Sequence, residues 1–152
     1  MHRATIPATL LSLIAAPTAV AQVSVTGIRD LAFGFLTLGV SSTVLPSDPV
    51  RAGQWRITAP VGQRIQVRLT VPNQLQGPSG ATLPVSIDNG DAFIQGTWTG
   101  SVPNSFNPGS NVNFTFTGGT QAIIRLGGQI TPAANQRPGA YTNTAVCTIT
   151  VF

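Results

Sequence analysis

The end of the chain, residues 144–152, alternates between apolar and mostly polar side chains. Successive side chains of a β-strand point to opposite faces, so this stretch has one apolar face and one threonine-rich face. The apolar set is Ala145, Cys147, Ile149 and Val151, and the other set is Thr144, Val146, Thr148, Thr150 and Phe152. The pattern predicts a strand of about ten residues with one face toward a core.

A strand this regular must pair along at least one edge, because buried backbone donors and acceptors need hydrogen-bond partners. Two interpretations remain open at this point. The strand is only the structural last strand of a sandwich, as most terminal strands are. Alternatively, it also borders a groove that another chain fills.

The same two-residue period recurs through the rest of the sequence. "QRIQVRLTV" at 63–71 places four apolar residues on one face and Gln66, Arg68 and Thr70 on the other, which predicts a half-buried antiparallel strand. Pro84 predicts that its own strand is an edge strand or starts late. Further strand candidates are 22–28, 54–59, 83–88, 92–98, 111–118 and 122–130.

Short strands separated by Gly, Pro and Asn favour an all-β fold, a sandwich or a barrel. The Pro/Gly-rich stretch 72–80 is typical of a long loop, and no segment after residue 21 predicts a helix of three turns. Lys and Glu are absent, which also disfavours exposed helices. Without a linker or a repeat, residues 22–152 are predicted to form one domain, long enough to build a core without disulfides.

The first residues predict a cleavable signal peptide, 1–21. Arg3 precedes the short apolar run "ATLLSLIAA", and "AVA" at 19–21 supplies small residues before a cut between Ala21 and Gln22. The expectation is therefore export to the periplasm, the cell surface or the extracellular space. No later segment is long and apolar enough to predict a membrane span.

The titratable residues argue against an enzyme. The one histidine, His2, lies in the predicted signal peptide, so neither a Ser–His nor a Cys–His arrangement can form in the mature chain. Zinc ligands are too few, and no cofactor or metal site is predicted. Seven arginines and four aspartates after residue 21 leave a net charge of +3, too scattered to predict nucleic-acid binding.

Three features each allow two interpretations. Asp88 and Asp91 in "IDNGDAF" flank a turn or offer oxygens to calcium, and the turn is favoured. Cys147 is a buried inert thiol or forms an intermolecular disulfide. Trp55 and Trp98 lie in the core or form a platform for stacking sugars, with the core favoured.

Two motifs carry a family resemblance. Gly139, fourteen positions from the end and followed by an alternating run with a terminal aromatic, resembles the C-terminal signature of chaperone–usher pilin subunits. "RDLAFGFLTLG" at 29–39 resembles the beginning of a bacterial family of pilin-like secreted domains of unknown function, allied to spore coat protein U. "LGGQITPAANQRPGAYTNTAVCTITVF" at 126–152 is similar to the end of that family.

The resemblance implies an immunoglobulin-like β-sandwich and a role in surface filaments or coats. The partners it implies are like subunits and, as in pilins, a periplasmic chaperone and an usher. The strand-addition interface is predicted at the groove-side strand, with Gly139 and Tyr141 where it starts. Its residues are Gly139, Tyr141, Ala145, Cys147, Ile149, Val151 and Phe152.

Two hypotheses of function follow. The first is a non-enzymatic structural subunit assembled by β-strand addition. The second is a stand-alone secreted binding module for glycans or the cell surface, using an Arg- or Trp-lined face. Two arrangements of the start of the chain remain open. Val23, Val25 and Ile28 belong to a short donor strand, or the segment pairs within its own sheet, in which case the protein is a terminal subunit or a closed sandwich that does not polymerise.

Overall fold

The computed structural model describes residues 22–96, 98–99 and 105–152. The predicted signal peptide and the side chain of Trp98 lie outside this description. The described residues form thirteen strands and one short 3-10 turn, and every strand pair is antiparallel. The all-β, antiparallel fold class is therefore confirmed.

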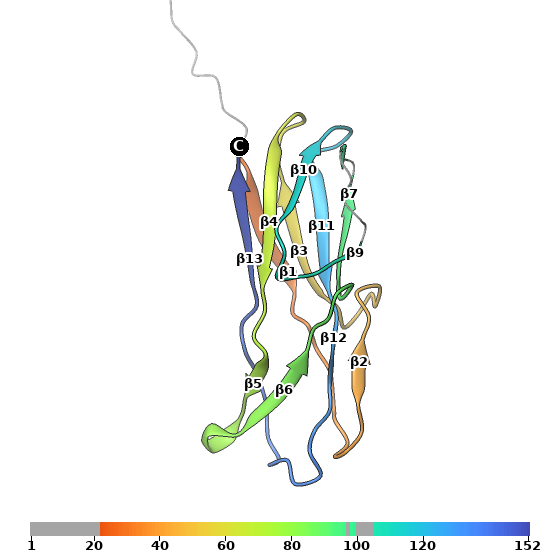
Figure 1. Cartoon of the computed structure of the whole chain (residues 1–152), viewed down its shortest axis with the longest axis vertical. Coiled ribbons are helices and arrows are strands. Elements are labelled where there is room, and N and C mark those ends of the chain that lie inside the picture. The colour runs from red at the N-terminus through yellow and green to blue at the C-terminus, as the bar shows by residue number, and fades with distance from the viewer. Residues whose placement is uncertain (1–21, 97, 100–104) are drawn as a thin grey trace, which may run out of the picture.

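Two sheets lie face to face and enclose the main core (Figure 1). The first, in spatial order, consists of β1 (Ser24–Arg29), β3 (Gly53–Thr58), β11 (Gln121–Leu126), β7 (Ala92–Gly96) and β9 (Ser105–Phe106). The second consists of β13 (Val146–Val151), β4 (Arg64–Thr70), β10 (Val112–Phe116) and β8 (Trp98–Thr99).

A third, smaller sheet extends the molecule at one end (Figure 1). It consists of β2 (Ser42–Val44), β12 (Gly128–Ile130), β6 (Thr82–Ser86) and β5 (Gln74–Gln76), with the turn η1 (Pro78–Gly80) between β5 and β6. Val44, Leu83 and Ile130 of this sheet are buried.

The core follows directly from the two-residue period of the sequence. In β4 the side chains of Ile65, Val67 and Leu69 are almost completely buried, whereas Arg64 and Arg68 between them are exposed. β11 supplies buried side chains from the opposite sheet in the same way. Burial of one such aliphatic side chain stabilises the fold by about 1.5–3 kcal/mol, so these faces hold the sheets together.

Glycine breaks the predicted strand 122–130 into β11 and β12. A side chain on Gly127 would collide with the Val44 carbonyl and Pro46, and Gly128 has a positive φ of 155°. At these two glycines the chain leaves the first sheet and enters the third, smaller sheet.

Three boundaries differ from the predictions. The terminal strand has six residues rather than about ten, because residues 143–145 leave the regular pairing with β4. The predicted loop 72–80 contains β5, which pairs with β6. Pro84 therefore does not mark an edge strand, since β6 pairs with β5 on one side and β12 on the other.

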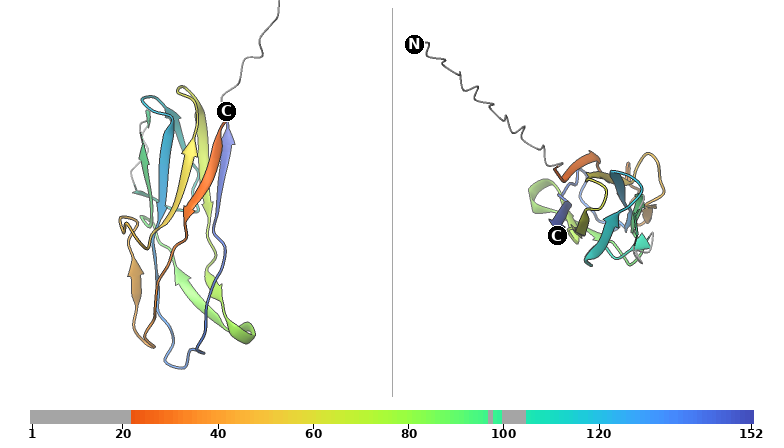
Figure 2. Two further views of the ribbon diagram at one scale, coloured as in Figure 1. Left: turned by 180° about the vertical axis from the view of Figure 1, so that it is seen from behind. Right: turned by 90° about the horizontal axis from the view of Figure 1, so that it is seen from above.

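The molecule is elongated, and the two ends of its described chain lie together at one end of the long axis (Figure 2). Ser24 pairs opposite Thr58 and Val151 opposite Ile65, next to the loop that joins β3 to β4. Residues 30–41, η1 and residues 131–141 lie toward the opposite end (Figure 1).

Candidate strand-addition groove

Each of the two large sheets ends in an edge strand that has a neighbour on one side only. The edge strands β1 and β13 lie on the same side of the molecule. Among the described residues β1 pairs only with β3, and β13 only with β4 (Figures 1 and 2). Each edge strand carries backbone N–H and C=O groups that another extended chain can bind. β13 is thus paired along one edge, as its alternation predicts.

The alternation of β13 divides its side chains as expected except at Val151, which was predicted on the apolar face but is exposed at the end of the strand. Ala145, Cys147 and Ile149 are half-buried and pack against the core, whereas Val146, Thr148 and Thr150 are exposed. Desolvation by burial raises the pKa of the Cys147 thiol to about 11. The thiol is therefore protonated at neutral pH, which makes it a weak nucleophile.

The last two residues of the predicted interface lie at the far end of β13. Val151 is 50% exposed and Phe152 is 63% exposed. The Arg64 guanidinium lies 5.5 Å from the centre of the Phe152 ring, and Gln63 Nε2 donates to the Phe152 carbonyl at 2.9 Å. Val151 and Phe152 therefore lie on the surface beside the start of β4. The structure does not place them near Gly139 and Tyr141, the first residues of the predicted interface.

Gly139 and Tyr141 lie where the terminal segment packs on the third sheet. Tyr141 Oη donates to the Arg137 carbonyl and accepts from Gln136 Nε2, each at 2.7 Å. A side chain on Gly77 would occupy the Tyr141 ring. Gly139 has a φ of +145° and lies against Pro78, so only glycine fits there without strain.

Backbone hydrogen bonds join this segment to β5. Gln76 and Thr142 exchange two of them, at 2.8 and 2.9 Å, and Asn143 Nδ2 donates to the Gln74 carbonyl at 2.7 Å. The segment from Gly139 to Val151 therefore runs first along the third sheet and then along the second.

A groove of about 1110 Å³ opens between this segment and the chain that follows β1. Residues 27–38 form one wall and residues 136–145 the other. The floor is apolar and consists of Trp55, Val71, Leu75, Leu83, Val85, Ile87, Leu126 and Ile130. Its volume lies at the upper end of the range for ligand pockets, and an extended segment of several residues fits better than a compact small molecule.

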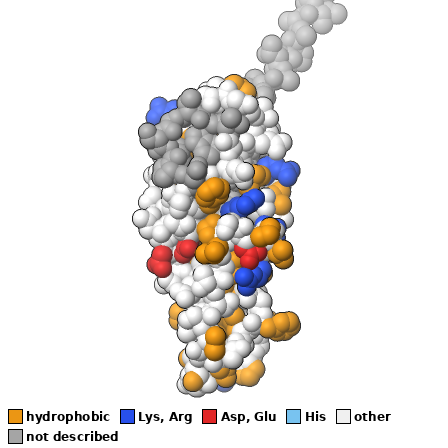
Figure 3. Space-filling view, turned by 90° about the vertical axis from the view of Figure 1, so that its right-hand side faces the viewer, with side chains coloured by type: hydrophobic (Ala, Val, Ile, Leu, Met, Phe, Trp, Pro, Cys, Tyr) orange, Lys and Arg blue, Asp and Glu red, His pale blue; other side chains and the backbone are white. Residues whose placement is uncertain are grey.

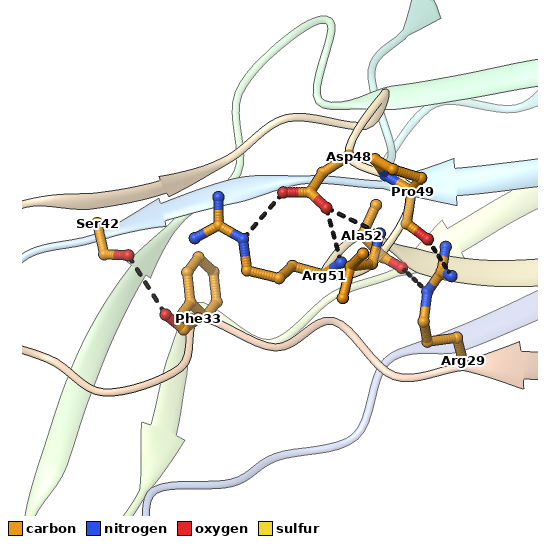
Figure 4. A network of polar contacts seen from close by, with 8 residues as sticks. Arg29, Phe33, Ser42, Asp48, Pro49, Arg51 and Ala52 are labelled. Carbon is orange, nitrogen blue, oxygen red and sulfur yellow. Dashed lines mark hydrogen bonds and ion pairs between the residues drawn. The ribbon is translucent and has the colours of Figure 1, made fainter.

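Arg29 anchors the first wall (Figure 4). Its Nε donates to the Ala52 carbonyl at 2.9 Å, and Nη1 donates to the Pro49 carbonyl. Nη2 donates to Gln54 Oε1 at 3.0 Å. Next along the chain, the Ala32 N–H donates to the Arg51 carbonyl at 2.9 Å. This wall is therefore fixed to the loop before β3 over residues 29–32.

The loop before β3 is itself held by Asp48 (Figure 4). Asp48 Oδ1 accepts the N–H groups of Val50 and Arg51 at 2.9 and 2.8 Å, and Oδ2 accepts Arg51 Nε at 2.9 Å. The two backbone hydrogen bonds are the largest cause of the lowered pKa of Asp48, about 2. The sequence analysis did not identify this support, although Asp and Arg three positions apart in "DPVR" were a possible signal.

Beyond residue 32 the first wall is held more loosely. The N–H groups of residues 33–36 have no hydrogen-bond acceptor within the described part of the chain. Phe35 is fully exposed and Leu38 is 53% exposed, although both line the groove. The stretch 33–36 therefore combines groove-lining residues with backbone N–H groups that have no acceptor among the described residues.

The groove brings together some predicted residues and adds others. Gly139, Tyr141 and Ala145 line it, whereas Cys147 and Ile149 continue the strand beyond its end. The floor residues of the third sheet were not predicted as site residues. Leu75 lies in the predicted loop 72–80, whereas Leu83, Val85 and Ile130 lie in the predicted strands 83–88 and 122–130, whose position beside the terminal segment is a tertiary property. Their signal was the apolar residue at every second position from Leu83 to Ile87.

The remaining candidates fall outside the groove, except for Trp55. Asp91 Oδ2 accepts the Asp88 N–H at 2.7 Å and the Asp91 N–H donates to the Asp88 carbonyl, so the two residues close a turn. Within the described ranges no three His, Cys, Asp or Glu side chains group as metal ligands. Trp55 is half-buried, packs against the core and lines the groove.

No helix in the described part of the chain is long and apolar enough to cross a membrane. No protein-family model and no curated protein sequence matches the chain. Among solved structures, a family 123 glycoside hydrolase from Clostridium perfringens, studied for glycolipid glycan hydrolysis, gives a TM-score of 0.42 at 11% identity. The match covers 86% of this chain but 25% of that one, and it carries no argument about either fold or function.

Proposed function

We propose that the protein is a non-enzymatic structural subunit of a bacterial surface filament or coat, assembled by β-strand addition. The observation that carries this proposal is the apolar groove beside two unpaired sheet edges. The proposal includes an immunoglobulin-like, pilin-like sandwich exported after removal of residues 1–21. A periplasmic chaperone and an usher belong to it as partners before assembly.

The chemistry of strand addition suits this groove. An added strand gains main-chain hydrogen bonds from the free edges, and its alternate side chains enter the apolar floor. The free N–H groups of residues 33–36 and the exposed Phe35 would be covered in the same step. The incoming segment should therefore be extended and apolar at every second position.

The placement of the chain ends supports repetition. Gln22 and β1 start at the end of the molecule opposite residues 131–141, which form part of the groove (Figures 1 and 2). A contact from the start of one subunit to the groove of the next is head-to-tail. Such a contact produces an open filament when its rotation does not close into a ring.

The candidate donor is the N-terminal segment of a second copy, residues 22–29. Within one copy this segment pairs in its own sheet as β1, the arrangement expected of a terminal subunit or a closed sandwich, so donation requires β1 to detach. Five of the six β1 residues are exposed, including Val25 at 40% and Ile28 at 42%. Detaching β1 therefore costs little buried apolar area, which makes exchange between copies feasible.

The experiment uses the chain from Gln22 onward and a synthetic peptide of residues 22–29, QVSVTGIR. The peptide should raise the melting temperature in a concentration-dependent way, because a ligand that binds only the native state stabilises it. A peptide carrying Val25→Asp should not. The Ala140→Trp variant, which fills the groove from an exposed wall position, should lose the effect.

Ala134→Trp is the matched control, since Ala134 is exposed and does not line the groove. It should respond to the peptide like the wild-type chain. A protein that stays monomeric at high concentration and gains no stability from the peptide would contradict the proposal.

The alternative function is a stand-alone secreted binding module. The partly exposed Trp55 in the groove and the arginines on the sheet surfaces are the observations that favour it. Size-exclusion chromatography separates the two functions. Ladder-like oligomers support the structural subunit, whereas a stable monomer that binds glycans supports the module.

A further inference from the structure

Three arginines share the outer face of the first sheet. In the strand register Arg29 lies opposite Gln54, and Gln54 lies opposite Arg125, so the three side chains form one row across β1, β3 and β11. Arg56 lies in the next row, opposite Ile123. Diagonal neighbours in an antiparallel sheet are about 7–8 Å apart, so Arg56 is close to both other arginines. We call Arg29, Arg56 and Arg125 the arginine face.

Two of these guanidinium groups have no acceptor. Arg29 is held by the Ala52 carbonyl and Gln54, but neither Arg56 nor Arg125 has a hydrogen-bond or ion-pair partner among the described residues. The Nε atom of Arg125 is buried and unsatisfied. The buried Nε stays unpaired, but an anion bound to the terminal guanidinium nitrogens would gain charge-assisted hydrogen bonds there.

No carboxylate neutralises the arginine face. Asp48 already pairs with Arg51, and Asp88 and Asp91 close the turn before β7. Asp30 forms no ion pair within the described residues. Figure 3 shows basic side chains with apolar ones between them on the side of the molecule where β7 and β11 lie, and the acidic side chains are few.

The apolar neighbours strengthen the case for anion binding. Ile123 and Phe93 are half-buried and lie opposite Arg56 and Arg125, respectively. Apolar groups beside a charge lower the local dielectric constant and strengthen its attraction to an anion. Planar guanidinium groups match carboxylates in a two-pronged geometry.

We propose that the arginine face binds a linear polysaccharide bearing carboxylates. Several positive charges on a flat, open sheet suit an extended polyanion, in which successive charges can engage Arg29, Arg56 and Arg125. Nucleic acid is disfavoured because single strands are held by stacking on exposed aromatic rings, and the aromatic residue of this face, Phe93, is half-buried. Arg56 and Arg125 lie on β3 and β11, outside the proposed donor segment 22–29, so their part of the face does not depend on the proposed assembly.

The test measures binding of the chain from Gln22 onward to polygalacturonate, with neutral dextran and a single-stranded DNA oligonucleotide as comparisons. Polygalacturonate should bind, with an affinity that falls as salt is added, because ionic contacts are screened. The double variant Arg56→Gln/Arg125→Gln should bind about tenfold more weakly, which corresponds to the loss of charge-assisted contacts.

The matched control is Arg64→Gln/Arg68→Gln, which removes the same charge from the outer face of β4. It should retain binding within about twofold. If Arg125→Gln impairs folding, Arg56→Gln alone should weaken binding and Arg56→Lys should restore it in part, because lysine keeps the charge but not the planar fork.

Three results would overturn the inference. They are equal losses in the two double variants, no binding to polygalacturonate at low salt, and tighter binding to the oligonucleotide than to the polysaccharide. The first would reduce the effect to net charge. Absence of binding at low salt would show that the face does not bind this polysaccharide. Tighter binding of the oligonucleotide would indicate that the partner is a nucleic acid.

Discussion

At the scale of single residues, the start of the terminal segment depends on two glycines that leave room for their neighbours. Gly139 adopts a positive φ against Pro78, and Gly77 lies under the Tyr141 ring. Both glycines allow residues 136–142 to pack closely against the third sheet. They therefore affect the shape of the groove wall rather than the core.

We expect Gly139→Ala to destabilise the protein by about 1–3 kcal/mol, because alanine is strained at this φ and its methyl group would collide with Pro78. Urea unfolding would measure the loss. Gly27→Ala is the control, because nothing lies within 4 Å of the added carbon and its φ is not positive. If Gly139→Ala is as stable as Gly27→Ala, the close approach to Pro78 has no energetic consequence.

Cys147 gives a prediction about pH. Its pKa rises from 9.0 to about 11 because burial disfavours the thiolate. At pH 8 the native thiol should therefore react with iodoacetamide about a hundredfold more slowly than the same thiol in the urea-unfolded chain.

Stability should follow the same shift. The unfolded chain loses the thiol proton near pH 9 while the native chain keeps it, so the free energy of unfolding should fall between about pH 9 and 11. Cys147→Ala should lack this part of the decline. A native thiol that reacts as fast as the unfolded one would mean that β13 does not shield it.

At the scale of elements, β13 combines a core face and a surface face, and the two can be tested separately. Ile149→Asp should destabilise the fold by about 3 kcal/mol, because it places a charge on the half-buried face that packs against the core. Thr150→Asp, one position on and exposed, should change stability by about 0.5 kcal/mol or less. Thermal unfolding would measure both losses. Equal, small losses in the two variants would mean that β13 does not pack tightly against the core.

How far the sequence predicts these elements depends on the kind of signal. The long strands β4, β10 and β11 lie where the two-residue period places them, because each buries one complete face. β5 and β2 have three residues each, too few for a period to be recognised. Their positions are set by pairing with other strands, β5 with the next strand β6 and β2 with β12 far along the chain, such as Val44 opposite Gly128.

The candidate site shows the same limit. Parity alone identified the core face of β13, but the groove depends on where residues 27–38 and 136–145 separate, which is a tertiary property. The Arg29 side chain that holds the first wall bonds to backbone carbonyls of Pro49 and Ala52, 20 and 23 residues further along the chain. No side-chain pattern in the sequence reports such contacts, because the acceptors are carbonyl groups that every residue has.

At the scale of the whole molecule, the separation of the chain start from the far part of the groove predicts the type of assembly. If a second copy donates residues 22–29, contacts should propagate from one subunit to the next rather than close into a dimer. A chain with Cys147→Ala, Val25→Cys and Ala140→Cys places one new thiol on the donor and one on the groove wall. Oxidation should then give a ladder of oligomers on a non-reducing gel.

Moving the second thiol to Ala134, which is exposed outside the groove, should reduce the ladder to the background of random collisions. A single dimer band would indicate reciprocal exchange of β1, which closes after two copies. Crosslinking that takes place only within one chain would show that β1 folds toward its own groove. Because the outcomes differ in product size, one gel separates an open filament, a closed dimer and a monomer, and only the ladder agrees with a filament-forming subunit.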